Sequence, residues 1–259
     1  MSTLASAQEP LEMPASSPTP TLPAPRLAPR HSLLVRFSHW ITTLAFFALL
    51  LSGAELVVSH PRFYWGETGN VLTEPWIKLP IPSSRNLVPT GYGYVLPDQN
   101  GWSRSLHFQP AWLLGITGML YVISGLATGH FRKSLFPAKS HLSFPHLANV
   151  VVHHLRFQRP TEAASYNALQ RLTYLAVIFV LFPLMIWTGL AMSPAFDAAI
   201  PATVNLLGGR QSARTIHFLI SIALVLFVLL HVGLVWLAGF KNRMRAMITG
   251  RTDLHGEGK

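Results

Sequence analysis

Four long apolar stretches constrain the fold of this chain more than any other feature. They run from Leu33 to Ser59, from His107 to Gly129, from Leu172 to Met192 and from Thr215 to Phe240. About 20 mostly apolar residues suffice to cross the hydrocarbon layer of a membrane, and backbone groups in lipid must form their hydrogen bonds within the segment. The four stretches therefore predict an all-α integral membrane protein, a four-helix bundle.

The content of charged residues and cysteine supports a membrane protein and narrows its metal chemistry. Charged residues make up 12% of the 259 residues, about half the share found in soluble domains. The chain has no cysteine, which excludes disulfides, zinc sites built on thiolates, iron–sulfur clusters with the usual ligands and haem attached through thioethers. Histidine, with 12 residues, is the main side chain left that could bind a soft metal ion.

The ends of the chain differ from its apolar middle. Residues 1–30 are rich in proline, serine and threonine and have no apolar periodicity, so we expect a disordered tail. Residues 31–250 form the predicted transmembrane domain, and residues 251–259 form a short C-terminal tail. Pro110 falls in the first turn of the predicted second helix, where its missing N–H costs little, whereas Pro183 lies inside the third and predicts a kink.

The basic residues predict the orientation in the membrane. Of the 20 Lys and Arg residues, 14 lie in the two tails, at the start of the first stretch and in the connection between the second and third stretches, and six lie in the other two loops. Since basic loops stay in the cytoplasm, both termini are predicted to be cytoplasmic. The net charge of +10 is explained in this way, and we expect no nucleic-acid partner. The long outer loop, His60 to Leu106, is either a docking surface or a cap over the helix ends.

Two histidines of the fourth stretch face the same way. His217 and His231 are 14 residues apart, which is close to a whole number of helical turns and about 21 Å along the helix axis. Each has a candidate partner at its own depth, because His39 lies near the cytoplasmic start of the first stretch and His107 opens the second from the outside. Two pairs at two depths fit two b-type haems, each held by two imidazoles, whereas zinc would want three or four ligands at one depth. His60 is the alternative outer ligand to His107.

Small and basic residues near these depths suggest how haem could be accommodated. Gly53 and Gly125 lie where a missing side chain would let a porphyrin approach, although glycine is also common in ordinary membrane-helix packing. Haem propionates are anionic and need cationic partners at the membrane surface. The candidates are Arg36 on the inner side and Arg104 and Arg214 on the outer side, although solvated loop arginines that only set topology would look the same.

The chain resembles a known family in several segments. It is similar to the four-helix cytochrome b subunits of bacterial Ni-Fe hydrogenases and formate dehydrogenases at Arg36–Trp40, His107–Phe108, His217 and His231. More specific segments resemble the branch described as thiosulfate-reductase-type cytochrome b, or membrane anchor, namely His60–Gly66, Ser124–Leu126 running to Gly129–Arg132, and Gly208–Arg214. The likeness covers about residues 31–250.

The resemblance implies a di-haem electron carrier of the bacterial inner membrane. It implies that His39 with His231 hold the cytoplasmic-side haem and that His107 with His217 hold the periplasmic-side haem. It also implies electron transfer between the quinone pool and a periplasmic redox protein, a molybdopterin oxidoreductase of the sulfite-oxidase type, with this chain as the electron-transfer subunit of a respiratory complex.

Two other functions stay open at the level of sequence. One is a stand-alone membrane haem oxidoreductase that acts on superoxide or metal ions, and the other is a haem-free membrane anchor or transporter. A quinone site could involve His153 and His154 with Arg156, or the surfaces of the first and fourth helices around the inner haem.

Overall fold

A computed structural model describes residues 31–70, 72–81, 102–137 and 168–251. The predicted N-terminal tail, most of the C-terminal tail and the candidate quinone residues His153, His154 and Arg156 lie outside this part of the chain. Within it, four helical segments are long and apolar enough to cross a membrane, namely Leu33–Ser59, Ser103–Ala127, Gln170–Ala191 and Arg210–Leu237. The all-α membrane fold expected from the sequence is thereby confirmed.

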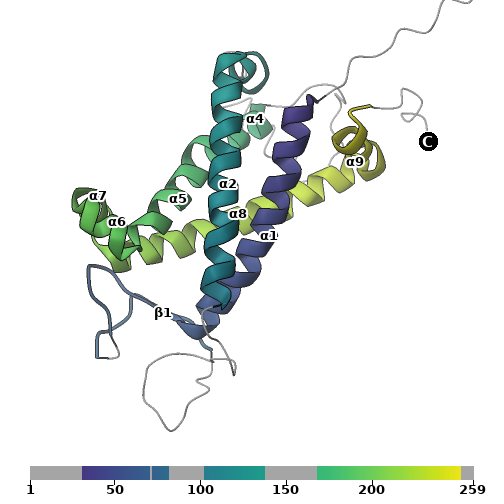
Figure 1. Ribbon diagram of the computed structural model, residues 1–259. Coiled ribbons are helices and arrows are strands. Elements are labelled where there is room, and N and C mark those ends of the chain that lie inside the picture. The colour runs from purple at the N-terminus through teal and green to yellow at the C-terminus, as the bar shows by residue number, and fades with distance from the viewer. Residues whose placement is uncertain (1–30, 71, 82–101, 138–167, 252–259) are drawn as a thin grey trace, which may run out of the picture.

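The four membrane segments form two packed pairs. Helix α1 (Leu33–Ser59) lies along α2 (Trp102–Ala127), and α5 (Phe182–Ala191) packs against α8 (Arg210–Leu237), which crosses behind the first pair (Figure 1). Phe46 of α1 contacts a buried apolar cluster between α8 and the third segment, so the two pairs share a core; the cluster consists of Val177, Ile220 and Leu224.

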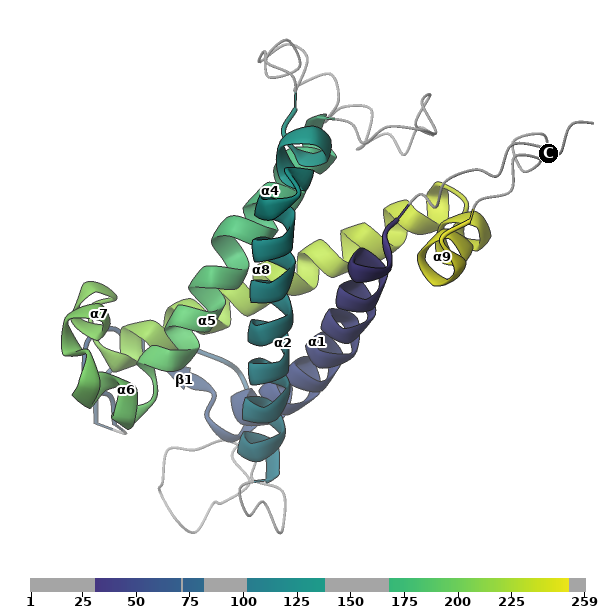
Figure 2. The same cartoon turned by 45° about the horizontal axis from the view of Figure 1, so that its top comes forward.

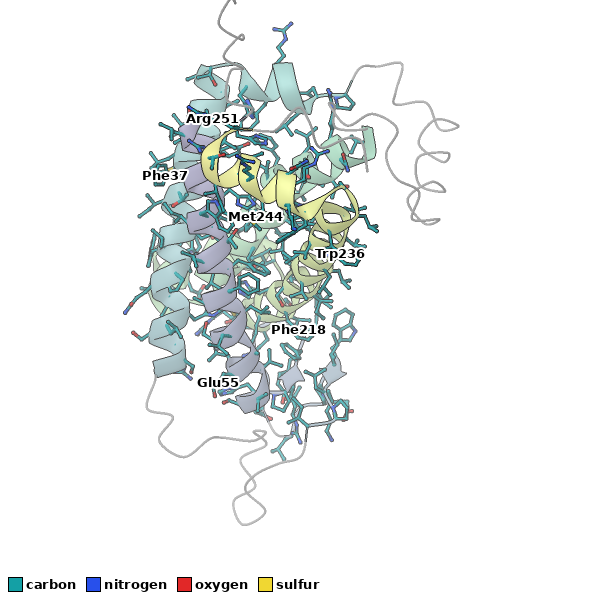
Figure 3. All side chains as sticks on the ribbon, turned by 90° about the vertical axis from the view of Figure 1, so that its right-hand side faces the viewer. Phe37, Glu55, Phe218, Trp236, Met244 and Arg251 are labelled. Carbon is teal, nitrogen blue, oxygen red and sulfur yellow. The ribbon has the colours of Figure 1, made fainter. Side chains whose placement is uncertain are left out.

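Large apolar side chains also cover the outside of the bundle. Leu44, Leu229 and Trp236 are more than 60% exposed, and Figure 3 shows Trp236 on the outer side of its helix. In water such a surface would be unfavourable, whereas in a bilayer it contacts lipid tails.

The third membrane segment is not a uniform α-helix. It consists of α4 (Ala168–Ala176), the π-helical segment η3 (Val177–Leu181) and α5. The N–H of Phe182 donates to the carbonyl of Val177, five residues earlier. Pro183 follows at once, and its ring would clash with the carbonyl of Phe179 in a regular α-helix. The wider π turn relieves that clash. The sequence predicted a kink at Pro183, and what the structure shows beside it is this π-helical segment.

Two helix starts differ from the sequence expectation. Helix α2 begins at Trp102, so Pro110 lies inside the helix instead of in its first turn, and the expected position of Pro110 was wrong. Polar residues before His107 had suggested a loop, yet they continue the helix beyond the apolar stretch. Helix α8 begins at Arg210, five residues before the apolar stretch. Residues of the loop before α2 make this earlier start possible, because they accept hydrogen bonds from the first N–H groups of α8.

That loop caps the start of α8. The carboxylate of Glu67 accepts the backbone N–H of Arg210 at 3.0 Å, and the carbonyl of Gly66 accepts the N–H groups of Gln211 and Ser212 at 3.1 and 3.2 Å. The first N–H groups of a helix have no partner within the helix, so the loop supplies these acceptors. A negative charge here also interacts favourably with the helix dipole.

Further contacts hold the loop on α8. The hydroxyl of Ser212 accepts the N–H of Gly66 at 2.7 Å, and the hydroxyl of Thr215 donates to the carbonyl of Tyr64 at 2.6 Å. The rings of Phe63 and Phe218 stack with centroids 4.2 Å apart. The loop also contains an antiparallel hairpin of β1 (Arg62–Phe63) and β2 (Ile77–Lys78), with Arg62 opposite Lys78. In this described part, the outer loop thus covers a helix end.

Short helices occupy both ends of the bundle. Helices α6 (Pro194–Ala199) and α7 (Pro201–Leu206) lie with the hairpin at one end, hereafter the hairpin end (Figure 2). At the other, the α9 end, lie the N-terminus of α1 and α9 (Phe240–Thr249), and the π-helical segment η1 (Phe131–Leu135) follows α2. Figure 3 shows Met244 and Arg251 at the α9 end and Glu55 toward the other.

The polar helix α9 is separate from α8, whereas the fourth stretch had been expected to run on to Phe240. Gly239 has a left-handed backbone with φ of 92°, which ends α8 and turns the chain. Trp40 Nε1 and Arg36 Nη1 of α1 donate to the carbonyls of Met247 and Ile248 at 3.3 and 2.7 Å. These donors satisfy two of the last carbonyls of α9 and attach it to α1.

Candidate functional site

The structure brings the four candidate histidines together as two pairs. The first histidine pair, His39 of α1 and His231 of α8, has ring centroids 6.4 Å apart and ring planes inclined by 50°. The second histidine pair, His107 of α2 and His217 of α8, has centroids 6.2 Å apart and an inclination of 62°. Since His217 and His231 share one helix, the two pairs lie at two levels of the bundle, separated by about 21 Å along the axis of α8.

The spacing within each pair has room for one metal ion. A bond from an imidazole nitrogen to a transition-metal ion is about 2 Å long, and the nitrogen lies about 1 Å from the ring centroid. Two such bonds end to end separate the centroids by about 6 Å, close to both observed values. No cluster of three or more His, Cys, Asp or Glu side chains able to hold a metal is found among the described residues. The donor set is therefore two imidazoles at each level.

Hydroxyl groups contact the rings of the second histidine pair. Ser52 Oγ lies 3.0 Å from His107 Nδ1, and Thr188 Oγ1 lies 3.0 Å from His217 Nδ1. Ser52 and Thr188 are both fully buried. Sequence reasoning missed these two residues, although each stands as a polar residue before a glycine inside an otherwise apolar helix.

Aromatic side chains surround the first histidine pair. Trp40 lies edge-on to His39 with centroids 5.4 Å apart, Phe227 stacks on His231 at 5.7 Å, and Tyr174 meets His231 edge-on at 6.4 Å. The Nδ1 atom of His39 is buried and has no hydrogen-bond partner among the described residues. Because an unpaired buried polar atom is costly, this level is built to interact with a further group.

The two glycines singled out in the sequence have different neighbours. A Cβ atom added to Gly53 would lie 3.4 Å from Cε1 of His107, so Gly53 lies at the level of the second histidine pair, as expected. Gly189 of α5 has the same relation to His217, also at 3.4 Å, and was not foreseen. At Gly125 the ring of Phe131 fills the space that a side chain would need, so its neighbour is this ring.

The candidate propionate partners lie at the two ends of the bundle. Arg36 lies one turn before His39, and its Nε atom is buried without a partner in the described part of the chain. Arg214 lies one turn before His217, where Nη2 donates to the carbonyl of His60 at 2.6 Å and the guanidinium lies over Phe63, 5.2 Å from the centroid. Arg104 is exposed near the start of α2.

His60, the alternative ligand, follows the last residue of α1. Its backbone N–H donates to the carbonyls of Leu56 and Val57 and so ends the helix. Burial, together with the positive charges of Arg214 and Arg104, lowers the pKa of His60 below its ordinary value of 6.5. The ring that faces His217 at 6.2 Å is that of His107.

Comparisons with known proteins identify the family of this chain. The model of a family described as prokaryotic cytochrome b561 matches residues 30–250. A protein of Azospira oryzae named putative protein-methionine-sulfoxide reductase subunit YedZ1 is 26% identical over 225 residues, which cover 85% of this chain and 96% of that protein. No solved structure shows a significant match to the chain.

The family match covers all four membrane segments and both histidine pairs. It confirms the bacterial membrane cytochrome b family that the sequence resembles, and with it the expectation of b-type haem and electron transport. The chain belongs to the prokaryotic cytochrome b561 family and is a multi-pass membrane b-type cytochrome that takes part in electron transfer.

Proposed function

We propose that this cytochrome holds two b-type haems and transfers electrons between the quinone pool and a redox partner outside the cytoplasm. His39 and His231 would hold one haem, and His107 and His217 the other. The observation that carries the proposal is the similar separation of the two ring pairs, 6.4 and 6.2 Å between centroids. A haem with two imidazole ligands exchanges single electrons between its ferric and ferrous forms.

The side chains at each level prepare a site for such a group. Gly53 and Gly189 allow the rings of His107 and His217 to approach their neighbouring helices closely. Arg36 at one level, and Arg104 and Arg214 at the other, each lie three residues before a ligand histidine, and they are candidates to bind propionates. Apolar and aromatic side chains pack around the pairs and exclude water. This low exposure to solvent would tune the reduction potential of a bound haem.

The orientation follows from charge. The α9 end carries Lys241, Arg243, Arg245 and Arg251, which supports a cytoplasmic position for this end of a protein in the bacterial inner membrane. The hairpin end, with the second histidine pair, would then face the periplasm. Electrons would cross the membrane from one level to the other.

The partner is proposed from two sources. The Azospira relative is named as a subunit of a reductase, which supports a complex of several chains. The sequence resemblance implies a molybdopterin oxidoreductase of the sulfite-oxidase type. Purification from native membranes in mild detergent should then yield molybdenum and haem in a constant ratio. If the cytochrome is purified from these membranes without molybdenum and still oxidises quinol at the rate of the native membranes, this partner is contradicted.

The quinone step has its own experiment. The full chain is reconstituted in lipid nanodiscs with its haems oxidised, and a water-soluble quinol is added while the visible spectrum is recorded. We expect the reduced b-type bands to form, and the oxidised quinone serves as the control that should leave the spectrum unchanged. Haems that dithionite reduces but quinol does not would contradict quinol as an electron donor to this protein.

A further inference from the structure

The same arrangement of side chains occurs twice around the second histidine pair. In α1, Ser52 contacts Nδ1 of His107 at 3.0 Å, and in α5, Thr188 contacts Nδ1 of His217 at 3.0 Å. In each case the residue after the hydroxyl is a glycine whose added Cβ would lie 3.4 Å from Cε1 of the same ring. Two separate helices thus present a hydroxyl and a glycine to an imidazole in the same way.

The hydroxyl protons are already directed to the backbone. Ser52 Oγ donates to the carbonyl of Ala48 at 2.8 Å and lies 3.2 Å from the carbonyl of Leu49. Thr188 Oγ1 donates to the carbonyl of Leu184 at 2.8 Å and lies 3.1 Å from that of Met185. A carbonyl only accepts, and a hydroxyl has a single proton to donate. Each oxygen therefore has only its lone pairs left for the imidazole.

This assigns the position of the proton on each ring. An oxygen that can only accept a hydrogen bond needs a nitrogen that carries a hydrogen as its donor. Nδ1 is therefore the protonated nitrogen in both His107 and His217. In a neutral imidazole the lone pair then belongs to Nε2. A metal ligand must supply a lone pair, and the hydrogen bond of the other nitrogen decides which nitrogen that is.

We propose that Ser52 and Thr188 are positioning residues that hold His107 and His217 with Nδ1–H donated to a hydroxyl and Nε2 directed to haem iron. This inference rests on the proposed haem ligation. Both hydroxyls are fully buried, and each ring also has a backbone carbonyl as a hydrogen-bond partner, that of Leu49 for His107 and that of Met185 for His217. A ring that lost its hydroxyl would keep only this carbonyl as an acceptor, so the hydrogen bond that sets its position and basicity would change.

The first histidine pair lacks this device on His39. The hydroxyls of Ser38 and Thr43 on the same helix donate to backbone carbonyls, that of Val35 at 3.1 Å and that of His39 at 2.8 Å. Nδ1 of His39 has no partner among the described residues. An imidazole that donates a hydrogen bond is a more basic ligand, and a more basic ligand favours ferric iron. The centre at the second pair should therefore depend on Ser52 and Thr188, and the other centre should not.

The test compares single variants of the full chain in detergent by redox titration and by electron paramagnetic resonance of the ferric protein. Ser52→Ala and Thr188→Val should raise the midpoint potential of one of the two haems and shift its low-spin signal, while the other haem keeps both properties. The conservative variants Ser52→Thr and Thr188→Ser should restore the values of the unmodified protein. Ser221→Ala is the matched control, because that hydroxyl of α8 bonds the carbonyl of Phe218 at 2.6 Å and contacts neither histidine pair among the described residues.

Each outcome decides the inference. If Ser52→Ala and Thr188→Val load both haems with unchanged potentials and signals, the positioning role is wrong while the di-haem function stands. If a variant loads only one haem, Ser52→Thr or Thr188→Ser must load both, and equal loss in the conservative variant overturns the inference. A wild-type preparation without two low-spin haems removes the proposed function and this inference with it.

Discussion

The carboxylate of Glu67 accepts the backbone N–H of Arg210 at 3.0 Å and so joins the loop before α2 to the helix that carries His217 and His231. Removing this cap leaves the first N–H of α8 unpaired in the fold. Glu67→Ala should lower the free energy of unfolding by about 1 kcal/mol, measured as a lower thermal midpoint in detergent. Glu74→Ala is the control, since Glu74 is an exposed acidic residue of the same loop. Equal midpoints for the two variants would contradict a capping role.

Loss of one histidine should affect one haem only. His107→Ala removes one of the two rings of the second pair, so we expect about half the haem per chain to be lost, with the spectrum of the other centre retained. His39→Ala should cause the same fractional loss at the other level. Pyridine haemochrome analysis of the purified chains measures both.

His60→Ala separates the two candidate outer ligands. Because His107 is the ring that faces His217, this variant should keep both haems. If His60→Ala instead holds half the haem and His107→Ala holds all of it, then His107 and His217 are not the two ligands of the outer haem.

The glycine next to each hydroxyl should tolerate one added carbon but not three. At Gly189 a Cβ atom would lie 3.4 Å from His217 Cε1, which is ordinary contact, so Gly189→Ala should load haem normally. The two extra methyl groups of Gly189→Val can be placed only at the expense of the ring position, and we expect about half the haem to be lost. Gly233→Val is the control, because nothing lies within 4 Å of that position. Full haem content in Gly189→Val would contradict this packing.

Acid should weaken the fold partly through His60. Its pKa is lowered in the folded protein by burial and by Arg214 and Arg104, so the unfolded chain binds more protons as the pH falls below about 6.5. Stability from this group is present above that pH and is lost as the pH falls toward the folded pKa. His60→Gln stays neutral, so its thermal midpoint should drop less than that of the unmodified protein between about pH 7.5 and pH 5. An equal or larger drop in His60→Gln would show that His60 carries none of this dependence.

Apolar length was enough to predict the membrane helices. Histidine depth placed His39 with His231 but left His107 and His60 as alternatives opposite His217, and the structure brings the ring of His107 to His217. Helix α1 was predicted with its observed bounds, because its apolar stretch coincides with the helix from Leu33 to Ser59. The starts of α2 and α8 were missed, because polar residues extend these helices beyond the lipid-facing stretch and because the α8 cap comes from Glu67, 143 residues away in sequence.

The surroundings of the histidines depend on contacts that sequence distance hides. Ser52 reaches His107 across 55 positions and Thr188 reaches His217 across 29. A helical wheel places each hydroxyl on a face of its own helix but does not say which ring lies opposite. Gly125 was interpreted by its position along α2, whereas its actual neighbour, Phe131, depends on the chain turning back at Gly129, which has a positive φ of 65°.

The most direct test of two haems on two histidine pairs is the haem-to-chain ratio of the purified full-length protein, taken together with the paramagnetic resonance spectrum of its ferric form. Two b-type haems per chain, both low-spin as two imidazole ligands require, is the predicted result. A ratio of one or zero, or a high-spin ferric signal from either centre in intact protein, would contradict the account.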